Sequence, residues 1–281
     1  MSLVTTATMR AALLLGGRSA RHVHAPCPTP GPDEVRIRVE GCGVCLSSLP
    51  LWEGREWFSY PLEPGAPGHE VWGWTDDGRR VAALCFNGFA EVDVAAAATV
   101  VELPKELDGL PFPGEALACA VNVVRRAAPP IDARVAVVGM GFLGSAVGQL
   151  LGDVTEIRRH THVEGEFDVV VEATGTQSGL DRAAQLVAAG GRLVIAGYHQ
   201  DGPRTVDLQG WNWRGIDVVN AHEREPQRYV AGIRAAVQLA VDGVLDLEAL
   251  ITHRLPLSHL EQAFELATRR PAGFVKAVVC P

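Results

Sequence analysis

The sequence lacks three features that would each have pointed to a particular class of protein. Six cysteines in 281 residues are too few for a disulfide-rich secreted scaffold. The longest apolar runs, such as Ala11–Leu15, fall far short of the roughly 20 residues that a membrane-spanning helix needs. Basic residues are not in excess either, and the net charge of −8 argues against nucleic acid or an anionic membrane as the main partner.

What is present is the composition of a globular protein of one large or two medium domains. Hydrophobic residues make up 47% and charged residues 21% of the chain. The apolar run near the N-terminus has only Arg10 ahead of it, so we interpret it as a strand and not as a signal peptide. We expect a cytoplasmic protein that acts on a small molecule.

The most informative stretch is Arg134–Gly175. The apolar run Val135–Val138 is typical of a strand buried on both faces, and a helical pattern follows the glycines of Gly139-x-Gly141-x-x-Gly144. In this context the first glycine permits the tight turn, the second lets a pyrophosphate approach the backbone, and the third lets helix and strand pack closely. The stretch therefore predicts a dinucleotide-binding unit, with the phosphates at the helix N-terminus.

This unit is shorter than usual. The next two predicted strands are 154–159 and 167–173, and only about seven residues separate them, where an ordinary doubly wound sheet needs on the order of 30 for a helix and a further strand. In the strand order 3-2-1-4-5-6 the missing strand lies at an edge, so the sheet can lose it without a gap in its centre.

The remaining segments are mostly β before this unit and alternate between α and β after it. A predicted helix at 180–188 is ended by Gly190-Gly191, and Ser258-x-x-Glu261 predicts a capping box that opens a last helix through 268. The other predicted strands are 9–16, 35–39, 71–75, 80–83, 90–94, 192–196, 216–219 and 274–279, and the other predicted helices are 115–127 and 229–241.

Four residues offer the donor types of a zinc site. Cys45 follows a strand, His69 and Glu70 stand together on a separate loop, and Glu115 begins a helix. Sulfur, nitrogen and oxygen donors from different loops suit a catalytic zinc with one position open. Taken singly, each could be an ordinary core or surface residue. Cys119, one turn after Glu115, is an alternative ligand.

In order and spacing, these segments resemble the medium-chain dehydrogenase/reductase family, specifically its zinc-dependent alcohol and polyol dehydrogenases. The resemblance rests on segments along almost the whole chain: MRAALL, PGPDEVRIRVEGCGVC, PGHE, GFAEV, EALACAVNVVRRA, GMGFLG, DVVVEATG, AAGGRLVIAG and GFVKAVV. It implies an α/β protein with a GroES-like β domain at residues 1–119 and 253–281. A Rossmann doubly wound parallel sheet, truncated by one helix and one edge strand, would occupy 120–252.

The resemblance also implies the site residues. Cys45 falls at the family's ligand cysteine, His69 and Glu70 at its GHE motif, and Glu115 at a further ligand or near-ligand; with Ser47 as a proton carrier, Cys45, His69 and Glu70 form the expected catalytic set. One catalytic zinc is expected. The expected cofactor-binding residues are Gly139, Gly141, Phe142, Leu143, Gly144, Arg158, Arg159, Thr174, Gly175 and Gly197.

The chain departs from the family at three places. The four-cysteine lobe of a structural zinc is absent, and only Leu84–Asn87 remain of it. Ser48 replaces an aspartate that supports the zinc-bound histidine, and loss of such a partner typically costs about 10–100-fold in metal affinity or activity. Pro50 replaces a relay histidine. Cys42 forms a C-x-x-C with Cys45, but we interpret it as a packing residue.

The expected reaction is hydride transfer between a nicotinamide cofactor and a secondary alcohol or ketone. Arg158 and Arg159 end the second strand where an acidic residue would bind the ribose of NAD, so they favour NADP(H), unless they form a solvated basic turn. The aromatic residues Trp52, Trp57, Phe58, Trp72, Trp74, Trp211 and Trp213 suggest a pocket for a bulky substrate, or else core and interface residues.

Two other functions fit the sequence. One is a zinc-free quinone or enoyl reductase of the same family, which the intact cysteine and GHE motif disfavour. The other is a non-catalytic relative that binds a ligand after losing cofactor capacity. The resemblance also implies a homodimer that pairs through the strand at 216–219.

Overall fold

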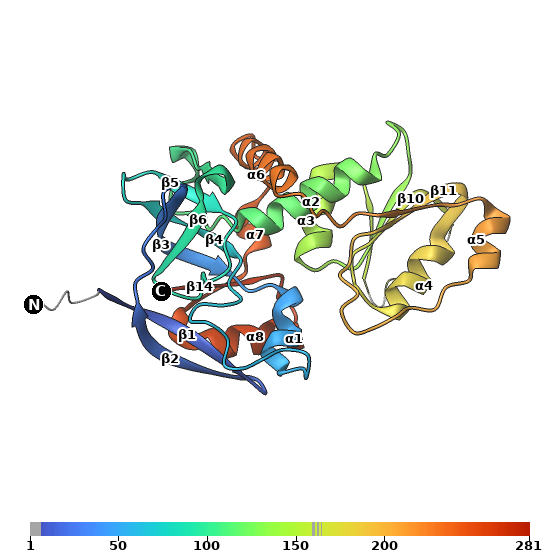
Figure 1. The fold of residues 1–281 in the computed structure, drawn as a ribbon. Helices are drawn as coiled ribbons and strands as arrows, with labels where there is room; N and C mark the ends of the chain where they lie inside the picture. Colours follow the sequence, from blue (N-terminus) through green and yellow to red (C-terminus); the bar gives the residue numbers. More distant parts are fainter. Residues whose placement is uncertain (1–6, 159–160, 162, 164) are drawn as a thin grey trace, which may run out of the picture. The chain divides into compact units, whose positions relative to one another are not determined.

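The structure is a computed structural model that describes residues 7–158, 161, 163 and 165–281. The chain divides into two units (Figure 1): unit 1 runs up to Ala116 and resumes at Leu247, and unit 2 is Leu117–Asp246. No described helix is both long enough and apolar enough to cross a membrane. All six cysteines lie in the described part of the chain, and none forms a disulfide.

Unit 1 is built on a mostly antiparallel β-sheet, in which only β13 and β14 pair in parallel among the described strands. Its strand order is β13-β14-β3-β4-β5-β7, with β6 added against β3, and the β1–β2 hairpin forms a separate sheet. The strands are β1 (Thr8–Gly16), β2 (Ser19–Pro26), β3 (Glu34–Gly43), β4 (Glu70–Thr75), β5 (Arg80–Ala83), β6 (Val92–Ala96), β7 (Val100–Glu102), β13 (His253–Pro256) and β14 (Ala277–Cys280). The helices are α1 (Leu49–Glu53), α7 (Leu247–Leu250), α8 (Leu260–Arg269) and the 3-10 turns η1 (Leu46–Ser48), η2 (Ala97–Thr99), η3 (Lys105–Leu107) and η4 (Leu257–His259).

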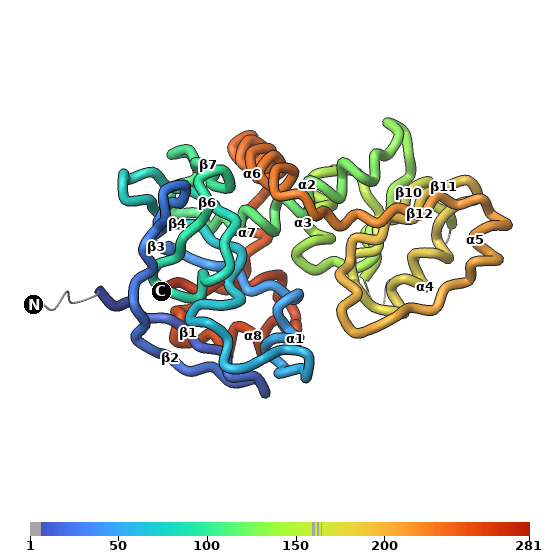
Figure 2. The backbone as a smooth tube through the Cα atoms, in the orientation of Figure 1, coloured from blue at the N-terminus to red at the C-terminus, as the bar shows by residue number. Residues whose placement is uncertain are grey.

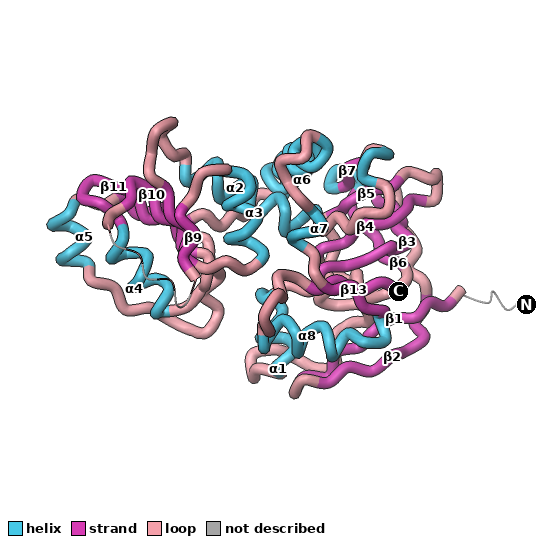
Figure 3. The backbone as a smooth tube through the Cα atoms, turned by 180° about the vertical axis from the view of Figure 1, so that it is seen from behind, coloured by secondary structure: helices cyan, strands magenta, loops and turns pink. Residues whose placement is uncertain are grey.

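The core of unit 1 joins segments from the two ends of the chain. Phe264 of α8 is fully buried and stacks on Trp52 of α1 with ring centroids 4.9 Å apart. The ring of Phe89 packs edge-on against that of Phe264, with centroids 5.9 Å apart. Because such rings bury large apolar areas, this cluster ties α8 to the N-terminal part of the unit. The closeness of α1 and α8 is visible from both sides of the molecule (Figures 1 and 3).

Unit 2 contains a five-stranded parallel sheet in the order β12-β11-β10-β8-β9. Its strands are β8 (Val135–Val138), β9 (Thr155–Ile157), β10 (Phe167–Glu172), β11 (Val187–Ile195) and β12 (Asp217–Asn220). Its helices are α3 (Phe142–Leu151), α4 (Gln177–Leu186), α5 (Leu208–Arg214) and α6 (Pro226–Val241), whereas α2 (Gly114–Ala127) begins just before the unit. Figure 2 traces this path along the backbone.

Apolar runs explain why these strands lie in the centre of unit 2. Every residue of β8 is buried, and β10 is buried at all but one position. Ala136 and Val170 pack in one cluster with Leu180 and Ala183 of α4, while Val137 and Val171 are buried on the other face. A strand buried on both faces needs helices on both sides, which is the doubly wound arrangement.

The shortened sheet is confirmed. In the six-strand order 3-2-1-4-5-6, the observed strands correspond to 6-5-4-1-2, so the third strand is missing and β9 is the edge. Residues 158–166 join β9 to β10, and those of them that the structure describes contain no helix or strand. The omission leaves the pairing of β8 with β10 intact.

The predicted end of the helix at 180–188 is wrong. Helix α4 ends at Leu186, and Gly190-Gly191 lie inside β11, where residues 188–191 bulge out of the pairing with β10. Gly190 has φ +70°, and a Cβ on Gly191 would lie 2.9 Å from the carbonyl oxygen of Asp168. The two glycines therefore serve a bulge, which needs a positive φ and a close approach of backbone.

The predicted capping box is also wrong. Ser258 lies in the turn η4 and its Oγ is 3.1 Å from Nδ1 of His259, which is the N-cap of α8 and makes no side-chain cap. The carboxylate of Glu261 instead accepts a hydrogen bond from the backbone N–H of Ala20 at 2.7 Å. Ala20 belongs to β2, a strand that the sequence patterns missed, as they missed β13 and α5.

Candidate metal and cofactor sites

Strand register brings the proposed zinc ligands together in unit 1. In the antiparallel ladder between β3 and β4, Gly43 pairs with Glu70. The end of β3 therefore lies beside the start of β4, so that Cys45, just after β3, meets His69, just before β4. Strand β14 lies on the other side of β3, where Val278 pairs with Gly43. Side chains from distant parts of the sequence thus meet at one end of the sheet.

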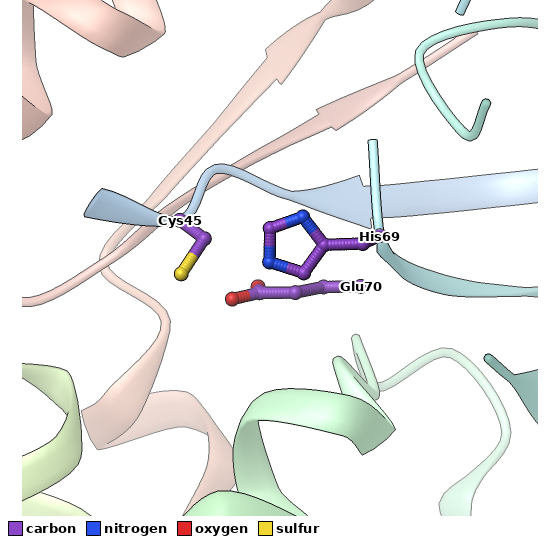
Figure 4. Close-up of side chains that lie close together, drawn as sticks. All are labelled: Cys45, His69 and Glu70. Atoms are coloured by element: carbon purple, nitrogen blue, oxygen red, sulfur yellow. The ribbon is translucent and has the colours of Figure 1, made fainter. Parts of the chain in front are cut away.

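Cys45, His69 and Glu70 form a group whose ligand atoms all lie within 4.8 Å of one another. Figure 4 shows the sulfur, the imidazole and the carboxylate pointing toward a common space. The sulfur is a soft donor, the imidazole nitrogen is borderline and the carboxylate oxygen is hard, which is a set that zinc accepts in catalytic sites with three protein ligands. The residues present therefore fit a zinc ion.

The orientation of His69 is set by the backbone. Its Nδ1 lies 2.9 Å from the carbonyl oxygen of Pro67. Because a carbonyl can only accept, Nδ1 carries the proton and Nε2 is left to face the other ligands. Metal-binding histidines are usually oriented by such a bond to a carboxylate, a backbone carbonyl or water. In this chain the carbonyl of Pro67 therefore orients the ring.

The electrostatics of the group favour a bound cation. Burial by itself lowers the pKa of His69, but the hydrogen bond and charge of Cys45 and the carboxylates of Glu115 and Glu70 raise it to about 10. The negative groups around the imidazole therefore favour its protonated form. A divalent metal can replace that proton and satisfy the same charges.

Ser47 lies between the sulfur and the imidazole. Its Oγ donates a hydrogen bond to Sγ of Cys45 at 3.1 Å and is 3.5 Å from Nε2 of His69. The hydroxyl that the sequence suggested as a proton carrier is therefore next to the ligand atoms. Pro50, which replaces the relay histidine, is buried in α1.

Glu70 is also one half of a buried ion pair. Its Oε1 accepts a hydrogen bond from Nζ of Lys276 at 2.8 Å, and both side chains are almost fully buried. Oε2 lies 2.8 Å from the same nitrogen, but no donor among the described residues makes a hydrogen bond to it. Burial lowers the pKa of Lys276, while the charges of Glu70, Cys45 and Glu115 raise it above its usual value. A buried oxygen without a hydrogen bond is one that a metal could satisfy.

Gly43 makes room for this pair. A Cβ at Gly43 would lie 1.7 Å from Oε2 of Glu70 and 2.9 Å from Cε of Lys276. Any larger residue would therefore displace the ion pair. The position therefore requires glycine, because the side chains of Glu70 and Lys276 pack directly against its backbone.

The remaining metal candidates lie elsewhere. Glu115, at the start of α2, is outside the group of three, although its charge reaches both His69 and Lys276. Its role as a ligand stays a prediction. The thiol of Cys119 lies 3.9 Å from the hydroxyl of Tyr229 and does not join the group. Cys42 is fully buried in the core of unit 1, as a packing residue would be.

The glycine-rich turn in unit 2 has the expected local geometry. Gly139 has φ +99°, which a side chain would strain. A Cβ on Gly144 would lie 1.9 Å from the carbonyl oxygen of Gly139, so this glycine allows helix and turn to touch. Gly141 is the N-cap of α3 and brings no side chain to the cap. The start of α3, with Phe142 and Leu143, therefore offers backbone N–H groups to an anion.

The other predicted cofactor residues surround this turn. Thr174 packs against Gly139, since a Cβ there would be 2.5 Å from Cγ2 of Thr174. Gly175 and Gly197 lie side by side in the turns after β10 and β11, where a Cβ on Gly197 would be 2.2 Å from the amide nitrogen of Gly175. Turns after parallel strands meet at one edge of a sheet, which is where doubly wound folds bind their ligands.

The adenosine end is less complete. Arg158 follows β9 and its Nη2 is 3.0 Å from Oε2 of Glu156, with both side chains well exposed. Arg159, the second predicted residue for the 2′-phosphate, lies outside the described residues. The charge that favours NADP(H) therefore rests on Arg158 in the described part of the chain.

Among the tryptophans near the proposed ligands, two are core residues. Trp52 and Trp72 are 1% and 2% exposed, so they cannot line an open pocket. The ring of Trp72 packs against Gly41, where a Cβ atom would clash with it. Trp57 is 67% exposed and has the guanidinium of Arg55 over its ring at 5.4 Å. Of these three tryptophans, only Trp57 is exposed enough to contact a substrate.

Sequence patterns missed four polar residues that the structure makes prominent. They are Lys276 at Glu70, and the group Glu172, His199 and Arg204 in unit 2. A signal was present for two of them. Lys276 and Glu172 each interrupt or end an apolar strand, and a charge in such a place is almost always paired.

Comparisons with known proteins agree with the fold and the motifs. No protein-family model matches the chain. The chain is 24% identical to sorbitol dehydrogenase of Gallus gallus, with 91% of this chain and 92% of that protein aligned. The alignment is 340 positions long, more than the length of this chain, so the relative contains segments that this chain lacks.

Two solved structures show the same fold over nearly their whole length. A cobalt- and zinc-bound thermostable alcohol dehydrogenase from Pyrobaculum aerophilum has a TM-score of 0.83 at 24% identity, covering 98% of this chain and 100% of its own. A zinc-binding dehydrogenase from Sinorhizobium meliloti 1021, solved with NADP bound, has a TM-score of 0.81 at 22% identity with the same coverage.

The antiparallel sheet of unit 1 and the five-stranded parallel sheet of unit 2 thus form a medium-chain dehydrogenase/reductase fold. Within that class, the sequence is similar to zinc-dependent alcohol and polyol dehydrogenases, in agreement with the resemblance of its motifs. Zinc and a nicotinamide cofactor are typical of this family.

The buried ion pair generates a prediction about stability. Replacing Lys276 by Met leaves the carboxylate of Glu70 buried without a cation, so we expect the free energy of unfolding in urea to fall by about 3–5 kcal/mol. The double variant Glu70→Gln/Lys276→Met should recover much of this loss. The control is Arg36→Met, which breaks the exposed pair with Asp76 and should cost less than about 1 kcal/mol. Equal effects of Lys276→Met and Arg36→Met would contradict the prediction.

Proposed function

We propose that this chain is a zinc-dependent oxidoreductase that transfers a hydride between a nicotinamide cofactor and a secondary alcohol or ketone. The observation that carries the proposal is the group of Cys45, His69 and Glu70, whose ligand atoms gather within 4.8 Å in surroundings that raise the pKa of the imidazole. The dinucleotide turn in unit 2 supplies the second half of such an enzyme.

Each residue of unit 1 has a proposed role. Cys45 and His69 hold the zinc, and Glu70, with its second oxygen free of hydrogen bonds, is a third ligand or stands beside the metal. When bound, zinc would supply a Lewis acid for the oxygen of the substrate. Ser47, 3.1 Å from the sulfur, takes the hydroxyl proton of the substrate and passes it outward.

Unit 2 binds the cofactor in this proposal. Gly139, Gly141 and Gly144 let the pyrophosphate reach the backbone at the start of α3. Thr174, Gly175 and Gly197 line the same edge of the sheet. A bulky or ring-containing substrate remains our proposal for this enzyme, supported by the exposed ring of Trp57.

The metal role can be tested by removing its ligands. We expect Cys45→Ser and His69→Ala to lower bound zinc from about one per chain to near zero and to lower hydride-transfer activity by more than about 100-fold, because each removes a direct ligand. Zinc is measured in dialysed protein, and activity by the absorbance of reduced cofactor with a panel of secondary alcohols and ketones. Cys280→Ser is the matched control and should change neither. Full activity in Cys45→Ser or His69→Ala would refute the zinc role.

The cofactor preference has its own test. The exposed pair of Arg158 with Glu156 is weak, so the guanidinium can turn to a 2′-phosphate. We expect Arg158→Gln to weaken the binding of NADPH about tenfold and to leave that of NADH unchanged, since one charge-assisted hydrogen-bonding group is lost. The exposed Arg234→Gln on α6 is the control. If wild-type protein uses NADH and NADPH equally well, the preference for NADP(H) is wrong.

A non-catalytic relative is the second candidate, because β9 is a three-residue edge strand on the side where the adenosine would bind. A dialysed sample distinguishes the candidates. Zinc without binding of NADPH, followed by nicotinamide fluorescence, favours the non-catalytic relative. Binding of NADPH without zinc favours the zinc-free reductase. Both together favour our proposal.

We also propose a homodimer that pairs through β12. This strand is the other edge of the sheet, and Val218 on it is 42% exposed. We expect light scattering to give the mass of a dimer, and Val218→Lys to give a monomer, because a charge on an edge strand opposes pairing. Val241→Lys, at a similarly exposed valine on α6, is the control and should stay dimeric. A monomeric wild type would exclude this proposal.

A further inference from the structure

A fully buried carboxylate lies at the carboxyl edge of the parallel sheet. Glu172 is the last residue of β10 and has no exposed surface. It accepts hydrogen bonds from the backbone N–H groups of Thr174 at 2.6 Å and Gly175 at 2.9 Å, and from the ring of His199 at 3.0 Å. A buried charge is retained only where such bonds replace water. Here the bonds come from two different turns.

His199 connects this carboxylate to an arginine. Nε of Arg204 lies 2.8 Å from Nδ1 of His199. Because a guanidinium can only donate, Nδ1 must accept, and the proton of a neutral imidazole is then on Nε2, where it is donated to Glu172. Arg204 also donates to the carbonyl oxygen of Gly175 at 2.9 Å and contacts Asp201. The hydrogen-bonded series Arg204–His199–Glu172 therefore contacts the backbone of Gly175 at both ends: Glu172 accepts from its N–H, and Arg204 donates to its carbonyl.

The turns after β10 and β11 contact each other through backbone atoms at two glycines. A Cβ on Gly175 would lie 2.6 Å from the carbonyl oxygen of Tyr198, and one on Gly197 would lie 2.8 Å from Oε2 of Glu172. Thr174 in turn contacts Gly139 of the phosphate-binding turn. The turns after β8, β10 and β11 are therefore in direct contact.

These turns lie on one side of the dinucleotide crevice. In a doubly wound sheet the pyrophosphate binds after the first strand, here β8, and the adenosine ribose is read at the end of the second, here β9. The strand order puts β10 and β11 on the opposite side of β8 from β9. The other half of the cofactor must therefore lie over the turns after β10 and β11.

We propose that Arg204, His199 and Glu172 are positioning residues that hold the turns at 173–176 and 196–199 for the nicotinamide half of the cofactor. The backbone N–H and C=O groups of these turns are the donors and acceptors that a carboxamide requires. The three side chains act through that backbone and do not touch the reacting atoms. The inference rests on the proposed function of the chain as a nicotinamide-dependent enzyme.

The test compares a whole cofactor with a fragment that lacks nicotinamide. The variants are His199→Phe, which keeps a ring but neither hydrogen bond, and Arg204→Gln. We expect calorimetric titration to show binding of NADPH weakened by about tenfold or more, while 2′-phospho-ADP-ribose binds as it does to the wild type. The nicotinamide fluorescence of bound NADPH should change as well, since it reports on the ring's surroundings.

Two further variants separate positioning from general damage. Arg192→Gln removes a guanidinium on the same strand β11 that donates to the carbonyl of Ala127 at 2.9 Å and to Asp217, and it should leave both ligands unaffected. Arg204→Lys keeps the charge but replaces the two nitrogens that bond to His199 and Gly175 with one, so it should retain part of the NADPH affinity. Should His199→Phe fail to fold, the pair Arg204→Gln and Arg204→Lys provides the same comparison.

The outcomes are distinct. If the variants weaken NADPH and the fragment equally, or weaken neither, the positioning role is wrong although the chain binds its cofactor. If the wild type binds neither NADPH nor NADH, the proposed function itself fails.

Discussion

The proposed active site depends on the alignment of three strands. Because β3 pairs with β14 on one side and β4 on the other, Lys276, Cys45 and Glu70 arrive at the same end of one sheet. The buried pair of Lys276 and Glu70 then fixes a carboxylate beside the sulfur and the imidazole, and Gly43 leaves the space for it. A shift of one residue in either ladder would turn these side chains to the opposite face and disperse the group.

Unit 2 shows how much of a dinucleotide-binding sheet can be removed without losing its centre. The strands next to the glycine-rich turn are paired and buried on both faces, while the missing strand would lie at an edge. The loss falls on the side that would receive the adenosine. On the other side, a buried carboxylate, a histidine and an arginine tie the turns together. In the proposed cofactor site, the side with these hydrogen-bonded turns and the shortened side are therefore separated by one strand, β8.

Much of the fold could be predicted because its signals are local. Val135–Val138 matches β8 residue for residue, and the glycines that follow need the conformations that the turn imposes. Errors arose where a local pattern had a distant partner. Ser258 and Glu261 have the spacing of a capping box, but Glu261 binds the backbone of Ala20 instead. Gly190-Gly191 resembled a helix stop, but they form a bulge beside β10.

The sequence by itself predicted the two kinds of sheet, the glycine-rich turn between β8 and α3, and a set of donor types that zinc accepts, because these follow from periodicity, glycine geometry and ligand chemistry. The tertiary structure alone decided what surrounds those residues. It gave Glu70 a buried lysine, oriented His69 by the carbonyl of Pro67, and placed Trp52 and Trp72 in the core. The physical reason is that a hydrogen bond or an ion pair depends on distance in space, and strand pairing brings together residues whose separation in sequence carries no sign of it.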